Sequence, residues 1–262
     1  MSVRAATLSH ALPAVSVTCD NGVAILTLQR PPINALIGPM INQIVAALAE
    51  LRQDTAVEAA VITGGIRNAF SSGGDLQALF SDELRECDPC EIVDLFREMQ
   101  EAFCAIESFP KPLVAAINGV CIGAGLELAL LCDLRVASEL AFFALPELAH
   151  GIIPGLGGTQ RLWRVVGLGR AKEMMMVGRR LRAEDALRWG LVQQLAPHRA
   201  TLAYAVTLAR EVGRKTPAAF AALKRVLREG TQMPLNAGLA YETKEFSELL
   251  VDRLGDATRR PS

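Results

Sequence analysis

Hydrophobic and polar positions first form two short apolar segments separated by a polar turn. Val15 to Cys19 and Val23 to Leu28 are rich in β-branched and aliphatic residues, and Asp20-Asn21-Gly22 lies between them. The Asn-Gly step supplies the positive backbone angles of a tight hairpin turn. We therefore predict a β-hairpin over residues 15–28, and Pro31-Pro32 ends its second strand.

A different spacing follows, in which apolar residues recur every three or four positions. It covers residues 38–53 and again residues 91–108, and predicts a helix with one buried face in each range. The apolar positions are Met40, Ile41, Ile44, Val45, Leu48 and Leu51 in the first range, and Ile92, Leu95, Phe96, Met99, Phe103 and Ile106 in the second. Pro110 and Pro112 follow the second range and end its helix.

Short apolar runs alternate with these helices. Residues 59–63, 113–117, 134–137 and 141–144 are expected to be strands, most of them buried. Strands that alternate with helices predict an α/β fold with mostly parallel strands. Residues 198–254 are instead almost entirely helical, with breaks at 213–217 and 230–234. We expect an N-terminal tail over 1–13, a core over 14–197 and a helical C-terminal region over 198–262.

Composition narrows the classes of partner. The 262 residues are 51% hydrophobic and 21% charged, with a formal net charge of -1. This balance disfavours binding to nucleic acids or to a membrane surface, because both require a basic face. No apolar run reaches the length of a membrane span, and residues 1–13 lack the apolar stretch of a secretory signal. We expect a cytoplasmic protein.

The cysteines give no sign of a metal centre. There are six, which we interpret as reduced thiols, several of them in the core. Cys87 and Cys90 form a C-x-x-C pair, but no second ligand pair accompanies it, and we place it in a charged connector. We expect neither a redox nor a metal function there.

Three glycine-containing segments carry candidate chemistry. They are residues 70–76, residues 118–127, and residues 145–148 followed by 151–161. In the first two, a glycine-rich turn enters a helix and exposes backbone N–H groups that no carbonyl satisfies. Two such turns aimed at one oxygen would form an oxyanion hole, in which each donor stabilises a transition state by roughly 3–4 kcal/mol.

Two glutamates lie in these segments. Glu127 is in the apolar run 126–131, and Glu147 follows Pro146 in another apolar run. Burial raises the pKa of a carboxyl group towards the range useful for proton transfer. Taken singly, each Glu is typical of a helix cap. Residues 155–158 resemble a phosphate cradle but match neither known glycine fingerprint, so a tight turn is the preferred interpretation.

The ordered set of motifs resembles the crotonase superfamily, and enoyl-CoA hydratases most. The resemblance runs from about residue 15 to about residue 250. It rests on residues 30–31, 34–36, 62–65, 70–76, 112–133, 146–147 and 153–162, with 190–192 where relatives carry a strand. It implies a spiral core of repeated ββα units. It also implies a helical C-terminal region that covers the active site and forms homotrimers, or homohexamers made from two trimers.

The resemblance also implies roles for individual residues. Glu127 and Glu147 correspond to the two catalytic glutamates, and the backbone N–H groups of Gly74 and Ala124 to the oxyanion hole, although relatives usually carry Gly at the position of Ala124. CoA would enter as part of an acyl-CoA substrate, with no separate cofactor and no metal. The substrate-binding positions implied are Ala35, Ser72, Gly73, Asp75, Leu76, Gly123, Gly125 and Pro146.

Several functions remain open at this point. The pair of glutamates favours hydration of a 2-trans-enoyl-CoA to a 3-hydroxyacyl-CoA through a thioester enolate. A Δ3,Δ2-enoyl-CoA isomerase needs only one base and the oxyanion hole, so Glu147 alone would suffice. A homologue that binds without catalysis is a third possibility. Relatives end in a basic cluster that contacts CoA, whereas Arg259 and Arg260 here are interpreted as a solvated tail.

Overall fold

The hairpin at the start of the chain is formed as predicted. The computed structural model describes residues 14–258, so the predicted tail, Arg259 and Arg260 lie outside it. Strands β1 (Val15–Asp20) and β2 (Val23–Leu28) pair antiparallel. Asn21 and Gly22 form the turn with φ values of 45° and 81°. The side chains of β2 alternate between two cores, because Val23 packs on one face of the sheet and Ala24 on the other.

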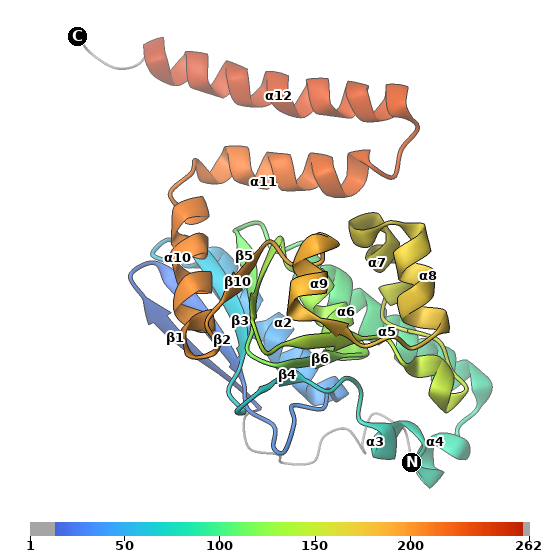
Figure 1. Cartoon of the computed structure of the whole chain (residues 1–262). Coiled ribbons are helices and arrows are strands. Elements are labelled where there is room, and N and C mark those ends of the chain that lie inside the picture. Colours follow the sequence, from blue (N-terminus) through green and yellow to red (C-terminus); the bar gives the residue numbers. More distant parts are fainter. Residues whose placement is uncertain (1–13, 259–262) are drawn as a thin grey trace.

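A six-stranded sheet forms the centre of the molecule (Figure 1). After β1 and β2 it continues through β3 (Ala59–Gly64), β5 (Leu113–Ile117), β7 (Leu134–Ser138) and β10 (Gln194–Ala196). All pairings after the first hairpin are parallel. The expected α/β class with mostly parallel strands is confirmed.

One predicted position in this sheet is wrong. The strand expected at residues 190–192 lies instead at 194–196. Gly190 has a left-handed backbone with φ 76°, and the N–H groups of Leu191 and Val192 donate to the Ala186 carbonyl. These residues therefore close the end of helix α9 (Ala183–Arg188) before the chain enters the sheet.

A second, smaller sheet makes the repeat visible. It contains β4 (Ala69–Ser71), β6 (Val120–Ile122), β8 (Phe142–Ala144) and the two-residue β9 (Leu181–Arg182). β4, β6 and β8 pair in parallel and follow β3, β5 and β7 respectively in the chain. Each pair of strands leads into helices, which is the ββα spiral expected from the resemblance.

Helices cover the larger sheet and connect the repeats. Helix α2 (Gly38–Gln53) buries the apolar face predicted from its spacing. Helix α5 (Pro89–Glu107) begins two residues earlier than predicted, because Asp88 and Glu91 form a reciprocal capping box. Two short helices, α3 (Leu76–Leu79) and α4 (Asp82–Arg85), precede it. Cys90 therefore lies in the first turn of α5 rather than in a connector.

The C-terminal region divides into a packed helix and an arm. Helix α10 (Thr201–Gly213) lies on the larger sheet, where Ala205, Val206 and Ala209 join a buried cluster. Beyond it, α11 (Pro217–Arg225), the helical turn at Val226–Gly230 and α12 (Leu235–Thr258) form an arm that stands away from the sheets (Figure 1). The predicted breaks near 213–217 and 230–234 are confirmed.

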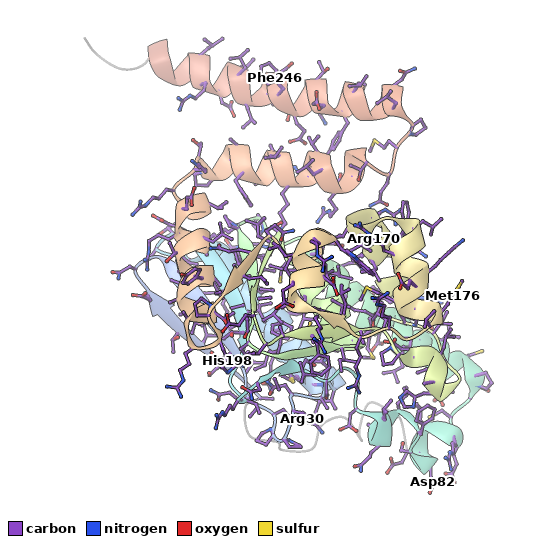
Figure 2. All side chains as sticks on the ribbon, viewed as in Figure 1. Arg30, Asp82, Arg170, Met176, His198 and Phe246 are labelled. Atoms are coloured by element: carbon purple, nitrogen blue, oxygen red, sulfur yellow. The ribbon has the colours of Figure 1, made fainter. Side chains whose placement is uncertain are left out.

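A largely buried ion pair connects the arm to the core. Lys224 on α11 donates to Asp133 at 2.9 Å. Asp133 lies between helix α6 (Ala124–Leu130) and strand β7. Figure 2 labels Phe246 on the arm at one end of the molecule and Arg30 at the opposite end.

Large apolar side chains are exposed along the arm, namely Leu223, Leu227, Leu235, Leu239, Phe246, Leu250, Val251 and Leu254. Within residues 14–258, no helix has the length and apolar character needed to cross a membrane.

Candidate active site

The two glycine turns predicted as oxyanion donors lie against each other. Gly73 has φ 99° and follows β4, while Gly123 has φ 53° and follows β6. A Cβ atom placed on Gly73 would lie 2.9 Å from the Ile122 carbonyl oxygen and 3.4 Å from the Ala124 nitrogen. The pairing of β4 with β6 thus brings the turns into backbone contact, and only glycine fits at Gly73.

Both N–H groups proposed for an oxyanion hole have no acceptor among the described residues. The flanking groups are used, since Leu36 donates to the Gly73 carbonyl and Asp75 donates to the Leu36 carbonyl. The Gly74 N–H between them donates to no described group, and a Cβ atom on Gly74 would meet nothing within 4 Å. Ala124 is the first residue of α6, where a helix leaves its N–H groups free.

A buried polar network, which sequence analysis missed, fixes the first turn. Asn34 is fully buried with φ 53°, and its side chain donates to the carbonyls of Ala69 and Phe70. Ser71 Oγ donates to the Asn34 carbonyl at 2.7 Å and accepts from the Gly73 N–H at 3.2 Å. The sequence signals were the positions of Asn34 and Ser71 within stretches that carry the family resemblance.

The other predicted substrate-binding positions of this region surround the same loop. Arg30 donates to the Ala35 carbonyl at 2.9 Å and pairs with Asp75 at 2.6 Å. The second oxygen of Asp75 caps α3, so its carboxylate is engaged within the fold. The Leu76 side chain is exposed, and the Ser72 N–H donates to the Ile33 carbonyl.

Glu127 is held by a turn from a distant part of the chain. Its side chain is buried in α6, and Oε1 accepts from the N–H groups of Leu156 at 2.9 Å and Gly158 at 2.7 Å. Burial raises the pKa of Glu127, while the N–H groups of Gly158 and Leu156 and the charge of Arg161 act against that rise. Residues 155–158 are thus a tight turn, as preferred, whose free N–H groups hold an internal carboxylate.

Glu147 lies beside the glycine turn of the second segment. It opens the short helix η1 (Glu147–His150), directly after Pro146. A Cβ atom on Gly123 would lie 3.1 Å from Glu147 Oε1, and Oε2 is buried with no hydrogen-bond partner among the described residues. Burial, opposed by its own backbone N–H and reinforced by the negative charge of Glu127, raises the pKa of Glu147 to about 7.

Gly125 allows the helix that carries Glu127 to pack closely on the strand before the first glycine turn. A Cβ atom on Gly125 would lie 2.7 Å from the backbone oxygen and the Cβ of Ser71, so this glycine permits α6 to pack on β4.

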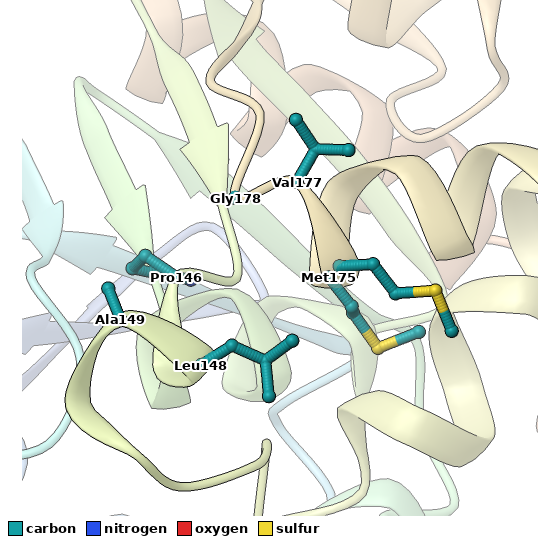
Figure 3. Close-up of a pocket in the computed structure, with 7 residues that line it drawn as sticks. Pro146, Leu148, Ala149, Met175, Val177 and Gly178 are labelled. Carbon is teal, nitrogen blue, oxygen red and sulfur yellow. The ribbon is translucent and has the colours of Figure 1, made fainter.

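Helix η1 also borders a hollow of about 260 Å³ next to the end of helix α8 (Leu168–Met176), shown in Figure 3. Its lining is apolar and consists of Pro146, Leu148, Ala149, Met175, Met176, Val177 and Gly178.

The structure therefore brings together Gly73, Gly74, Gly123, Ala124 and Glu147 and links them to Glu127. Two free N–H groups beside one buried and one partly buried carboxyl group are suited to chemistry in which an oxygen gains negative charge and protons move nearby. The fold and this arrangement together define a crotonase-type protein. Among solved structures, an enoyl-CoA hydratase from Bacillus anthracis is 31% identical, with 94% of this chain and 95% of that chain covered and a TM-score of 0.83.

Comparison of sequences gives the family. Residues 18–253 match the family described as Enoyl-CoA hydratase/isomerase, and the chain belongs to that family. A 2,3-dehydroadipyl-CoA hydratase from Escherichia coli is 42% identical, and a short-chain-enoyl-CoA hydratase from Clostridium acetobutylicum is 34% identical. Each alignment covers 87% of this chain and 86% of the relative. The protein is an enzyme of this family, and an acyl-CoA thioester is the kind of substrate consistent with it.

Proposed function

We propose that the protein adds water to a 2-trans-enoyl-CoA and forms a 3-hydroxyacyl-CoA. The observation that carries this proposal is the unequal setting of the two glutamates. Glu127 receives two backbone N–H donors, which favour its carboxylate form, whereas the buried Oε2 of Glu147 has no donor among the described residues and favours the neutral acid. A base and an acid in one site are what hydration requires.

The proposed reaction adds the elements of water across the C2=C3 bond. Glu127 accepts a proton from the water as the water oxygen bonds to C3. The C2=C3 electron pair moves into the thioester, and the N–H groups of Gly74 and Ala124 stabilise the resulting enolate oxygen. Glu147 gives its proton to C2. Transfer of a proton from Glu127 to Glu147 then returns both groups to their starting forms.

The substrate site of this proposal follows the same loops. The thioester would lie across the contact between the turns at Gly73 and Gly123, and the CoA portion along the loop formed by Ala35, Asp75 and Leu76. CoA is here a part of the substrate, and the proposal includes no separate cofactor or metal. Names of relatives support hydration as the reaction type, since two of them are hydratases of different enoyl-CoA thioesters.

The test is a steady-state panel of 2-trans-enoyl-CoA thioesters of increasing chain length, including 2,3-dehydroadipyl-CoA. We expect loss of the conjugated enoyl absorbance with the unmodified protein. Glu127→Gln and Glu147→Gln should each lower kcat at least ~10²-fold, the usual scale of acid–base catalysis. Glu211→Gln is the matched control, because Glu211 is exposed on α10. If neither site variant lowers kcat, the assigned roles are wrong.

The same panel, extended with 3-enoyl-CoA thioesters, separates hydration from isomerisation. An isomerase would convert a 3-enoyl-CoA with Glu147 alone, and Glu127→Gln would leave that activity intact. Activity on 3-enoyl-CoA, with no loss of 2-enoyl absorbance at any chain length, would replace the hydratase proposal by the isomerase. Complete inactivity of the folded protein on both substrate series would favour a homologue that binds without catalysis.

The proposal extends to assembly and location. The exposed apolar side chains on α11 and α12 support a homotrimer or a homohexamer built through the arm, in which the C-terminal region covers an active site. Sedimentation equilibrium should give three or six chains, and a monomer at micromolar concentration would contradict this. The net charge of -1 supports the absence of nucleic-acid partners, and a cytoplasmic location remains a prediction.

A further inference from the structure

Behind Glu127 lies a set of contacts that the proposed reaction does not use. The turn at residues 155–158 holds Glu127 with the N–H groups of Leu156 and Gly158, and two of its carbonyl groups accept from side chains. Gln100 Nε2 on α5 donates to the Gly155 carbonyl at 2.8 Å, and Arg161 donates to the Leu156 carbonyl at 3.2 Å. The carbonyls of Gly155 and Leu156 are thus both bound by side chains.

Arg161 is itself fixed by a carboxylate on α5. Its Nε and second terminal nitrogen donate to the two oxygens of Glu107 at 2.9 Å and 2.8 Å, a two-pronged geometry. Both side chains are largely buried, with relative exposures of 19% and 25%. Gly157, at φ 105°, leaves the space that the guanidinium occupies, since a Cβ atom there would overlap it.

The two sides of the turn share a peptide group. The carbonyl of Gly155 and the N–H of Leu156 belong to one peptide bond, so the hydrogen bond from Gln100 polarises the N–H that binds Glu127. The guanidinium of Arg161 places a positive charge behind the same turn. We infer that Gln100, Glu107 and Arg161 form a clamp of positioning residues, which fixes the turn and through it the place and ionised form of Glu127.

This inference rests on the proposed function, in which Glu127 is the base. Burial raises the pKa of Glu127, and the charge of Arg161 on α7 (Gly158–Val166) opposes that rise. The charge of Glu127 in turn raises the pKa of Glu147 on η1. On β6, burial raises the pKa of the Cys121 thiol well above its usual range, so the thiol stays neutral. Loss of Arg161 should therefore raise the pKa of Glu127.

The experiment compares Arg161→Gln with Arg161→Lys, Gln100→Leu and the control Arg164→Gln. Arg164 lies one turn further along the same helix and is exposed. We expect Arg161→Gln to lower kcat at least ~10-fold with KM within about 2-fold, because a positioned base acts in the chemical step. The acidic limb of the kcat/KM profile should move to higher pH. Arg161→Lys keeps the positive charge, so the acidic limb should stay at its original pH, but kcat should still be lower than in the unmodified protein. Gln100→Leu should lower kcat to a smaller extent than Arg161→Gln.

A second measurement does not depend on activity. Infrared titration of the Glu127 carboxyl, isolated as the difference between each protein and its Glu127→Gln counterpart, should give a higher midpoint in Arg161→Gln than in Arg164→Gln. Equal midpoints together with equal kcat values would overturn the clamp. If the unmodified protein hydrates no enoyl-CoA, the proposed function fails and the infrared midpoints alone decide the clamp. If Arg161→Gln does not fold, Glu107→Gln tests positioning alone, because it releases the guanidinium but keeps its charge. In that variant kcat should fall without a rise of the infrared midpoint, and an unchanged kcat would overturn the clamp.

Discussion

Glu127 and Glu147 interact electrostatically, but their hydrogen bonds differ. Glu127 Oε1 accepts from two backbone N–H groups, whereas Glu147 Oε2 is buried without a partner among the described residues. Donors stabilise the ionised form of a carboxyl group, and burial without donors stabilises the neutral form. Near neutral pH the pair therefore carries its negative charge mainly on Glu127, and a proton on Glu147 remains available.

The first prediction concerns the pH dependence of hydration. The pKa of Glu147 is raised to about 7, and its protonated form is the proposed acid. The value of kcat/KM should therefore fall as pH rises through about 7, with a second decrease at low pH where Glu127 takes up a proton. A profile from pH 4 to 10 with a short-chain substrate checks this, and a flat profile from pH 6 to 9 would contradict it.

The second prediction concerns stability. Because the folded pKa of Glu147 lies above the usual 4.5, its stabilising contribution is complete below about pH 4.5 and is lost as pH rises through about 7. Glu147→Gln mimics the neutral acid. The side chain is only partly buried, so screening reduces the effect, and the variant should raise the free energy of unfolding at pH 8 by about 1–2 kcal/mol.

Chemical denaturation at two pH values tests this second prediction. At pH 4.5 the variant and the unmodified protein should have nearly equal free energies of unfolding, since both then carry a neutral group at position 147. An identical difference at pH 4.5 and pH 8 would mean that titration of Glu147 is not its source. Glu211→Gln again serves as the control, because its carboxyl is exposed on α10.

The third prediction uses two adjacent glycines. Gly73→Ala places a side chain at φ 99° and 2.9 Å from the Ile122 carbonyl, so it should cost about 1–3 kcal/mol and displace the Gly74 N–H. Gly74→Ala meets nothing within 4 Å and should change stability by less than about 0.5 kcal/mol. Thermal unfolding of the two variants makes the comparison, and equal melting temperatures would show that Gly73 tolerates a side chain at the contact between the turns.

The fourth prediction concerns the junction of the arm. Asp133 accepts from Lys224 at 2.9 Å and from the Leu113 N–H at 2.8 Å, and only about a tenth of the Lys224 side chain is exposed. Lys224→Met leaves the Asp133 carboxylate buried without its cation and should cost about 3–5 kcal/mol. Adding Asp133→Asn should recover part of this loss.

The control for the junction is an exposed pair of the same charge type. Arg97 and Asp94 lie on α5 with more than half of each side chain exposed. Arg97→Met should therefore cost at most about 1 kcal/mol. A comparable loss for Arg97→Met and Lys224→Met in urea unfolding would rule out a special contribution of the buried junction.

The sequence by itself determined the local elements and the nature of the candidate site. Spacing of apolar residues predicted the helix at Gly38–Gln53, because burial of one helix face imposes a period of 3.6 residues. The Asn-Gly turn predicted the hairpin, and short apolar runs that alternate with helices predicted the parallel strands, which are buried on both faces. Glycines before a helix indicated free N–H groups, since that conformation leaves them without acceptors. At residues 190–192 the signals for a strand and for the end of a helix compete, and the strand lies a few residues later than predicted, at 194–196.

Only the tertiary structure decided which distant groups meet. Glu127 and the turn at residues 155–158 are brought together by the packing of α6 against α7, and nothing in either segment encodes that contact locally. The same holds for Asn34 with Ser71 and for Arg161 with Glu107. Local sequence sets backbone geometry, but the pKa of a buried carboxyl depends on every donor and charge around it, and those come from several strands and helices at once.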